Sequence, residues 1–219
     1  MAIGVVSLDL RDSEIYLETL SDALMALEAD GLGAGGAKLQ PIAGQIWMGK
    51  LSASKGPEGH VGVKRSRVRN EALRARVFVR DRFRCTSCGG RSVPRQVLVA
   101  IHDLFPEAIP YDPHYAHGKM HPVFWALAPE ADHRHPHAHG GENSLENLTT
   151  LHAACNTMKS DSIRAASAST APDGEPDRWD GLLAYYPTLI AAGAGKVRPN
   201  YHQEWVRRYA IALNTAAAT

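Results

Sequence analysis

The chain has 219 residues, of which 44% are hydrophobic and 21% are charged. This composition excludes wholesale disorder and indicates a folded globular protein. No stretch approaches the ~18 consecutive apolar residues of a membrane span, and the first residues lack the basic start and long apolar core of a signal peptide. The formal net charge of +1 does not by itself indicate any charged partner, but the charge is unevenly distributed.

The N-terminal 60 residues contain one clear helical pattern. Tyr16, Leu20, Leu24 and Leu27 repeat at helical spacing, which predicts an amphipathic helix over residues 13–30 that ends at Gly31. The glycine-rich residues 31–36 predict a flexible break, and residues 45–48 predict a short strand. Residues 1–60 carry eight acidic and four basic side chains, which does not favour nucleic-acid contact. We interpret this region as a dimerisation element, which would make the protein a homodimer, or as a packing scaffold.

A strongly basic segment follows. Residues 61–95 hold eleven Lys or Arg and two acidic residues, a local charge of +9, so the rest of the chain carries −8. Guanidinium groups bind phosphate in a bidentate manner, so an Arg-rich helix over residues 74–84 is a candidate nucleic-acid contact. The alternative is a helix face that is merely solvated. The candidate contacts are Arg74, Arg76, Arg80, Arg82 and Arg84.

The three cysteines form two spaced pairs with one histidine. Cys85 and Cys88 are two residues apart and precede two glycines, and His152 and Cys155 repeat the same spacing. Three thiolates and one imidazole suffice for a closed tetrahedral zinc site, so we predict structural Zn²⁺ here. A CxxC pair alone would also suit redox chemistry, but no thioredoxin-like βαβ pattern surrounds it. The other alternative is two buried cysteines and an unrelated surface histidine.

Residues 131–160 predict a β-hairpin followed by a helix. A short strand ends at Asp132 and His133, glycines 140 and 141 open a loop, residues 148–151 favour a second strand, and a helix begins near residue 153. This arrangement places Asp132 and His133 opposite Asn156. A carboxylate and an amide oxygen can share a hard divalent cation, and the adjacent imidazole can deprotonate water.

The C-terminal part predicts a polar linker over residues 166–178 and helices over residues 179–192 and 200–216. In the last helix, Trp205, Tyr209 and Leu213 share one stripe, which we interpret as a contact with the core.

The stretch around the hairpin resembles the HNH endonuclease family, the zinc-supported branch of the ββα-metal nucleases. The resemblance covers about residues 70–165 and includes the upstream Cys85-x-x-Cys88 pair. The matching residues are Asp132-His133, Pro136, Gly140-Gly141, Asn147-Leu148, Cys155-Asn156 and Lys159-Ser160. The 43 residues between Cys88 and Asp132 form a long insert for this motif, either a substrate-contacting loop or a packed extension.

The resemblance implies a role for each matching residue. His133 would be the general base, Asp132 and Asn156 would ligate one catalytic Mg²⁺ or Mn²⁺, and Asn147 would brace the loop between the strands. The zinc set would be structural, and the cleavage products would carry 5′-phosphate and 3′-hydroxyl ends. His137 and Lys159 are further candidates for phosphate contact. Alternating histidines from residue 133 to residue 139 indicate either a metal or phosphate cluster or one base among polar side chains.

These observations predict an α+β fold, with a ββα-metal nuclease core and zinc knuckle flanked by mainly helical extensions. The predicted boundaries are 1–60 for the N-terminal extension, 61–165 for the nuclease domain and 166–219 for the linker and C-terminal helices. We expect a metal-dependent endonuclease that acts on double-stranded DNA in restriction, defence, or mobile-element or phage DNA processing. The expected setting is the cytoplasm of a bacterial or phage-type system, without membrane binding. The alternatives are a zinc-stapled nucleic-acid-binding module that does not cleave, and an RNA-targeting or toxin nuclease.

Overall fold

The computed structural model describes residues 4–6, 13–49, 68, 70–135, 140–159 and 179–218. It is a mixed α+β structure in which a β-hairpin and a helix accompany a Cys3His cluster, and it is mostly helical elsewhere.

The chain forms two compact units that each combine separate stretches of sequence. The first unit comprises Met1–Lys50, Val93–Ala128 and Leu182–Val206; the second comprises Leu51–Ser92, Pro129–Gly181 and Arg207–Thr219. The three consecutive ranges expected from the sequence stay a prediction.

Two packed helices begin the first unit. Helix α1 (Ser13–Asp30) has the predicted bounds and buries its leucine stripe. The expectation of a flexible break over residues 31–36 is wrong, because helix α2 (Leu32–Lys38) follows at once. Only Gly31 breaks the helical backbone, with φ at +84°. Gly35 explains the tight packing, since a Cβ there would lie 3.0 Å from that of Leu27 on α1.

The insert between the two halves of the motif is a packed part of the first unit. Helix α4 (Arg95–Leu104) buries every residue from Gln96 to Ile101, and helix α5 (Val123–Ala126) follows a loop. Buried His121 precedes α5, donates from Nε2 to the Ile42 carbonyl at 2.8 Å, and accepts at Nδ1 from the Val123 amide at 3.2 Å. Strand β2 (Gln45–Trp47) occupies most of the predicted range and pairs in parallel with β1 (Gly4–Val6). These contacts agree with the interpretation of the insert as a packed extension.

The C-terminal elements of the first unit differ from the single helix expected over residues 179–192. The chain forms a 3-10 turn η3 (Leu183–Tyr185), helix α7 (Tyr186–Leu189), a wide turn η4 (Ile190–Ala194) and helix α8 (Gly195–Val197). Gly193, with φ at +140°, explains why no continuous helix forms. Helix α9 (Pro199–Ala217), which begins in the first unit and ends in the second, matches the last predicted helix.

The core position predicted for one residue of the α9 stripe is wrong. Trp205 and Tyr209 are 3% exposed, as expected for core residues, but Leu213 is 44% exposed. Ala212 is buried in its place, at 3% exposure. A helix completes one turn every 3.6 residues, so residues spaced four apart rotate away from the buried face, and the third residue of the series has left it.

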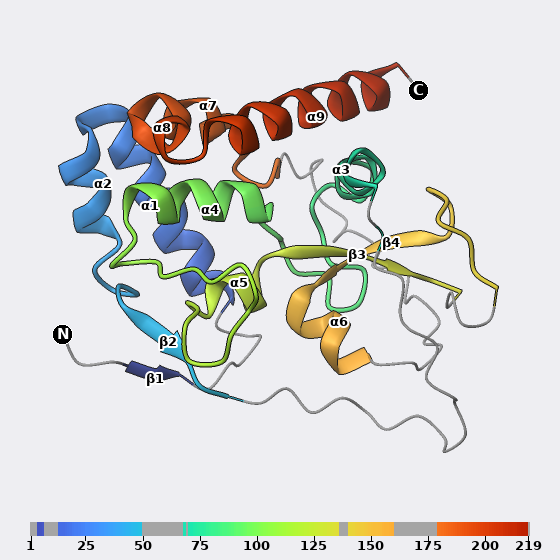
Figure 1. Cartoon of the computed structure of the whole chain (residues 1–219), viewed down its shortest axis with the longest axis horizontal. Coiled ribbons are helices and arrows are strands. Elements are labelled where there is room, and N and C mark those ends of the chain that lie inside the picture. The colour runs from blue at the N-terminus through green and yellow to red at the C-terminus, as the bar shows by residue number, and fades with distance from the viewer. Residues whose placement is uncertain are drawn as a thin grey trace. The chain divides into compact units, whose positions relative to one another are not determined.

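The second unit is built around a hairpin. Strand β3 (Pro129–His133) pairs antiparallel with β4 (Leu148–His152), with Asp132 opposite Thr149 and His133 opposite Leu148. Helix α6 (Ala153–Lys159) continues directly from β4. Figure 1 shows α6 on one side of the hairpin and α3 on the other. The predicted strand ends and helix start are confirmed at these positions.

Helix α3 (Glu71–Arg80) is shorter than the predicted helix over residues 74–84. Asn70 caps its first turn by accepting a hydrogen bond from the Leu73 amide at 3.0 Å. The helix ends at Arg80, because Arg82 and Phe83 both adopt left-handed backbone conformations with φ at +52°. Arg82 and Arg84 therefore lie in the turn before the cysteines and not on a helix.

In the part of the chain that the structure describes, no helix combines the length and the apolar character needed to cross a membrane. The predicted linker over residues 166–178 lies outside the described residues.

Candidate functional site

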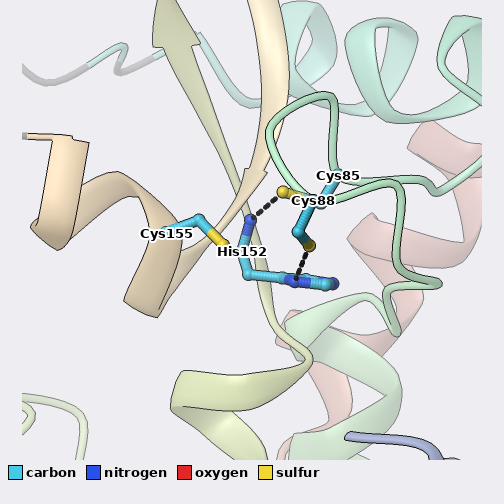
Figure 2. A group of neighbouring side chains, drawn as sticks. All are labelled: Cys85, Cys88, His152 and Cys155. Carbon is cyan, nitrogen blue, oxygen red and sulfur yellow. Dashed lines mark hydrogen bonds between the residues drawn. The ribbon is translucent and has the colours of Figure 1, made fainter. Parts of the chain in front are cut away.

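Four metal-binding side chains gather in the second unit. The sulfurs of Cys85, Cys88 and Cys155 and a ring nitrogen of His152 all lie within 4.8 Å of one another. Figure 2 shows that two of them come from the loop after α3, one from the end of β4 and one from α6. Three sulfurs and one imidazole nitrogen at this spacing fit a tetrahedral zinc ion. The Cys85–Cys88 pair and the His152–Cys155 pair, which were predicted from their spacing to form one site, thus lie together in the structure.

The first two cysteines lie on a tight turn. The Cys85 amide donates to the Gly90 carbonyl at 2.9 Å, and the Gly89 amide donates to the Cys85 carbonyl at 2.8 Å. A Cβ on Gly90 would lie 3.1 Å from the His152 ring and 3.3 Å from the Cys88 sulfur. Glycine at this position therefore lets the loop pass close to two of the four donors.

Hydrogen bonds fix the orientation of the His152 ring. Nε2 donates to the Arg91 carbonyl at 3.0 Å, while Nδ1 faces the Cys88 sulfur at 3.5 Å. The backbone amide of His152 also donates to the Cys85 sulfur at 3.4 Å, as Figure 2 shows. A histidine ligand commonly donates its other ring nitrogen to a carbonyl in this way. Nδ1 is therefore the nitrogen that would reach a metal.

Hydrogen bonds within the cluster favour the thiolate form of Cys85 and the protonated form of His152, so a metal would bind His152 only with release of a proton. Side-chain hydrogen bonds with Cys155 and Cys88 hold the pKa of the Cys85 thiol far below its usual range, against the opposing effect of burial. Burial lowers the pKa of His152, but hydrogen bonds to Cys85 and Cys88 outweigh it and raise the pKa to about 10. Thiolate is the form of cysteine that binds metal.

Asn147 joins the two sides of the hairpin loop. Its side chain donates from Nδ2 to the carbonyls of His135 at 3.1 Å and Glu142 at 2.9 Å, and its Oδ1 accepts from the His135 amide at 2.9 Å. Its own carbonyl accepts from the Arg134 amide at 2.7 Å. A Cβ on Gly141 would collide with the His135 carbonyl, so only glycine fits beside this network. Such contacts on both sides of the loop are what a residue that braces the loop between the strands requires.

His133 lies at the end of β3 and is 8% exposed. Its Nε2 is 2.8 Å from the Asn143 side-chain oxygen. Asp132 precedes it on the opposite face of the strand and is partly exposed. The candidate base is thus held by a loop residue that the sequence interpretation did not assign a role. The sequence offers little indication of this role for Asn143, because asparagine is common in any loop.

Asn156 projects from α6 toward β3, where it contacts a second residue that was missed. Its Nδ2 donates to the Glu130 carboxylate at 3.2 Å. Glu130 and Asp132 are two residues apart on a strand, so they share one face. This period of two was visible in the sequence and would have identified Glu130. Carboxylate and amide oxygens are suited to Mg²⁺ or Mn²⁺, so Asp132 and Asn156 fit the expected catalytic metal by donor type.

The candidate arginines differ in their surroundings. Arg80 donates to the carbonyls of Leu145 and, at 2.7 Å, Leu148, and it pairs with Asp81 at 2.8 Å. Asp81 in turn accepts from the Thr150 amide at 2.8 Å, so this pair ties α3 to the hairpin.

The remaining candidates for nucleic-acid contact include one more arginine with an internal partner. Arg84 donates to the Gly89 carbonyl at 2.9 Å, inside the cysteine turn. Arg74 is partly exposed and lies over the Phe78 ring, while Arg76 and Arg82 are exposed. His137 and the side chain of Lys159 lie outside the described residues.

The comparison with protein families finds an HNH endonuclease domain in this chain, at residues 122–162. This range contains β3, the hairpin loop, β4 and α6, and it includes His152 and Cys155 of the Cys3His cluster. No curated protein and no solved structure matches the chain. The match confirms the family resemblance that the sequence motifs carry.

Proposed function

We propose that the protein is a metal-dependent endonuclease that hydrolyses phosphodiester bonds in double-stranded DNA. The observation that carries the proposal is the placement of the HNH residues on a β-hairpin and helix: Asp132 and His133 end β3, and Asn156 lies on α6 across from that strand. The HNH match implies a nucleic-acid substrate and nuclease activity. DNA as the substrate, and a role in restriction, defence or mobile-element or phage DNA processing, belong to the proposal.

In this proposal His133 accepts a proton from the attacking water. Asp132 and Asn156 hold one Mg²⁺ or Mn²⁺, which supplies a positive charge that stabilises the scissile phosphate and the leaving 3′ oxygen. Attack by water on phosphorus leaves a 5′-phosphate and a 3′-hydroxyl. Asn147 supports this chemistry by holding the loop that follows His133, through its bonds to the backbone of His135 and Glu142.

The Cys3His cluster acts as a structural zinc site in this proposal. Zinc would link the turn after α3 to α6, which carries Asn156, and to β4, which pairs with the strand that carries Asp132 and His133. A hairpin and a two-turn helix bury little apolar surface, so a metal clip supplies stability that their small core does not.

The DNA contacts are proposed to involve the basic residues that precede the site. Exposed Arg76 and Arg82, with Arg74, His137 and Lys159, contact phosphates, while Arg80 and Arg84 act mainly through the carbonyls that they already bind. The predicted domain division and the homodimer remain part of the proposal.

The test is a plasmid cleavage assay with Mg²⁺ or Mn²⁺ on the zinc-loaded full chain. We expect cleavage by the wild type and none by His133→Ala or Asn156→Ala, with His114→Ala, an exposed histidine outside the site, as the matched control. Circular dichroism and zinc content verify that each variant is folded. Cleavage that persists in a folded His133→Ala sample would refute the assigned base.

Two further outcomes separate the alternatives. Tight DNA binding without cleavage of any substrate would favour the non-cleaving zinc-stapled module. Cleavage of RNA with DNA left intact would favour an RNA-targeting or toxin nuclease. Ligation of the cut DNA without prior phosphate treatment tests the predicted end groups.

A further inference from the structure

We propose that Glu130 is a positioning residue that fixes the side-chain amide of Asn156, so that the Asn156 oxygen and not its nitrogen faces the catalytic cation. The inference rests on the proposed function, in which Asn156 is a ligand of that cation. It adds a residue with no assigned role to the site and explains how a neutral amide is prepared to bind a metal.

The first step is the placement of Glu130. It pairs with Leu151 in the hairpin register, and Asp132 pairs with Thr149. Alternation along β3 puts Glu130 and Asp132 on the same face of the strand, because successive side chains point to opposite sides. Both are partly exposed, as is Asn156. Glu130 and Asp132 thus lie at successive positions on one strand face, and Asn156 contacts the former.

The second step is the chemistry of the contact. An ionised carboxylate only accepts hydrogen bonds, whereas an amide has one accepting oxygen and one donating nitrogen. The 3.2 Å contact between Asn156 and the Glu130 carboxylate must therefore involve the amide nitrogen as donor. Because the oxygen lies on the other branch of the same planar group, it turns away from Glu130. The carboxylate thereby selects one of the two amide orientations.

The third step is the consequence for a cation. A reversed amide presents N–H donors, which do not ligate a metal, and its oxygen faces the Glu130 carboxylate, where two acceptors repel. With Glu130 present, Asn156 is in its metal-binding orientation before a cation arrives. Partners that orient metal ligands typically change metal affinity by about 10–100-fold when they are removed.

The test measures Mn²⁺ binding to the zinc-loaded full chain without DNA, by electron paramagnetic resonance titration. We expect Glu130→Ala to weaken Mn²⁺ binding about 10-fold or more. Glu130→Gln keeps an accepting oxygen but removes the charge, and it should remain within about 3-fold of the wild type if the hydrogen bond is what matters. Glu107→Ala removes an equal charge from an exposed position outside the site and serves as the matched control.

A double-mutant cycle shows whether Glu130 acts through Asn156. If it does, Glu130→Ala has almost no further effect in the Asn156→Ala background, because coupled residues are not additive. Additive effects, or a Glu130→Gln loss as large as that of Glu130→Ala, would overturn the inference and indicate that Glu130 acts through its charge or as a direct ligand.

The cycle also separates this inference from the proposed function. If Asn156→Ala weakens Mn²⁺ binding but Glu130→Ala does not, the inference alone fails. If Asn156→Ala binds Mn²⁺ like the wild type, the ligand assignment in the proposed function fails first and the inference fails with it.

A measurement on the wild type keeps the proposal testable even if Glu130→Ala does not fold. We expect one proton of the Asn156 side-chain amide to exchange slowly with water in nuclear magnetic resonance spectra, because the hydrogen bond to Glu130 protects it. Rapid exchange of that amide with water would overturn the inference.

Discussion

Replacing Gly141 by alanine should separate the geometry of the hairpin loop from the stability of the fold. A Cβ on Gly141 would lie 2.8 Å from the His135 carbonyl carbon and 2.9 Å from the Asn147 amide nitrogen, where ordinary contacts are 3.4–4 Å. The His135 carbonyl oxygen would lie closer still, so this carbonyl has to retreat by more than about 1 Å to reach normal contact distances. That movement breaks the hydrogen bonds that join His135 to Asn147.

The adjacent glycine provides a control of similar thermodynamic cost. Gly140 has φ at +88°, and a Cβ added there would have nothing within 4 Å. Gly140→Ala should therefore cost about 1–2 kcal/mol through backbone strain alone. Gly141→Ala loses two hydrogen bonds worth about 1 kcal/mol each, so its expected cost is about 2 kcal/mol. The two variants should unfold at similar urea concentrations.

Their catalytic rates should differ sharply. A displacement of about 1 Å near a catalytic group costs about 100-fold in rate, and His135 lies two residues from the proposed base His133. We expect Gly141→Ala to cleave plasmid DNA about 100-fold more slowly than Gly140→Ala in single-turnover assays on zinc-loaded protein. If the two variants cleave within about 3-fold of each other, the loop does not position the base, and the reasoning is refuted.

Three further changes test other parts of the structure. Purified protein should contain about one zinc per chain by mass spectrometry, and Cys88→Ser should lose it while the exposed neighbour Ser87→Ala retains it. Burial lowers the pKa of His121 to about 4. As the pH falls below about 6.5, His121 is therefore protonated in the unfolded state but stays neutral in the folded state. His121 should therefore contribute a stability loss of about 2 kcal/mol between about pH 6.5 and pH 5, and calorimetry should find the total loss smaller by about that amount in His121→Gln. Arg80→Gln should lower the free energy of unfolding in urea by about 2–3 kcal/mol, because it removes the hydrogen bonds to two carbonyls and the ion pair with Asp81. Exposed Arg76→Gln should stay within about 0.5 kcal/mol of the wild type. Equal costs for the two arginines would contradict the structural role of Arg80.

The hairpin and the cysteine cluster could be predicted because their signals are local. Strand alternation, two glycines and a change to helical composition fall within about thirty residues, and the structure places β3, β4 and α6 where that pattern put them. The four residues of the Cys3His cluster carry two identical spacings, and their ligand atoms lie within 4.8 Å of one another. Both the hairpin–helix unit and the metal cluster require fixed spacings between residues, so these spacings can be recognised in the sequence.

The miss at residues 32–38 comes from packing between elements. These residues look too rich in glycine for a helix, yet the absence of a Cβ at Gly35 is what lets α2 approach α1. The deciding neighbour, Leu27, lies on another helix, so this choice appears only when the chain is folded. The miss at Leu213 has a local cause, because the 3.6-residue period of the helix places Ala212 rather than Leu213 on the buried face.

The basic segment shows why a count of charges overstates a binding surface. Guanidinium offers five donors that suit a backbone carbonyl and a phosphate oxygen equally well. Arg80 directs its donors to the hairpin and to Asp81, and Arg84 donates one to the cysteine turn, so both contribute to the architecture of the site. Arg76 and Arg82 carry the same charge but are exposed, which is the condition for contact with a phosphate backbone. The same residue type therefore serves two roles within ten positions, and the internal hydrogen-bond partners of each side chain, which the charge pattern does not encode, decide between them.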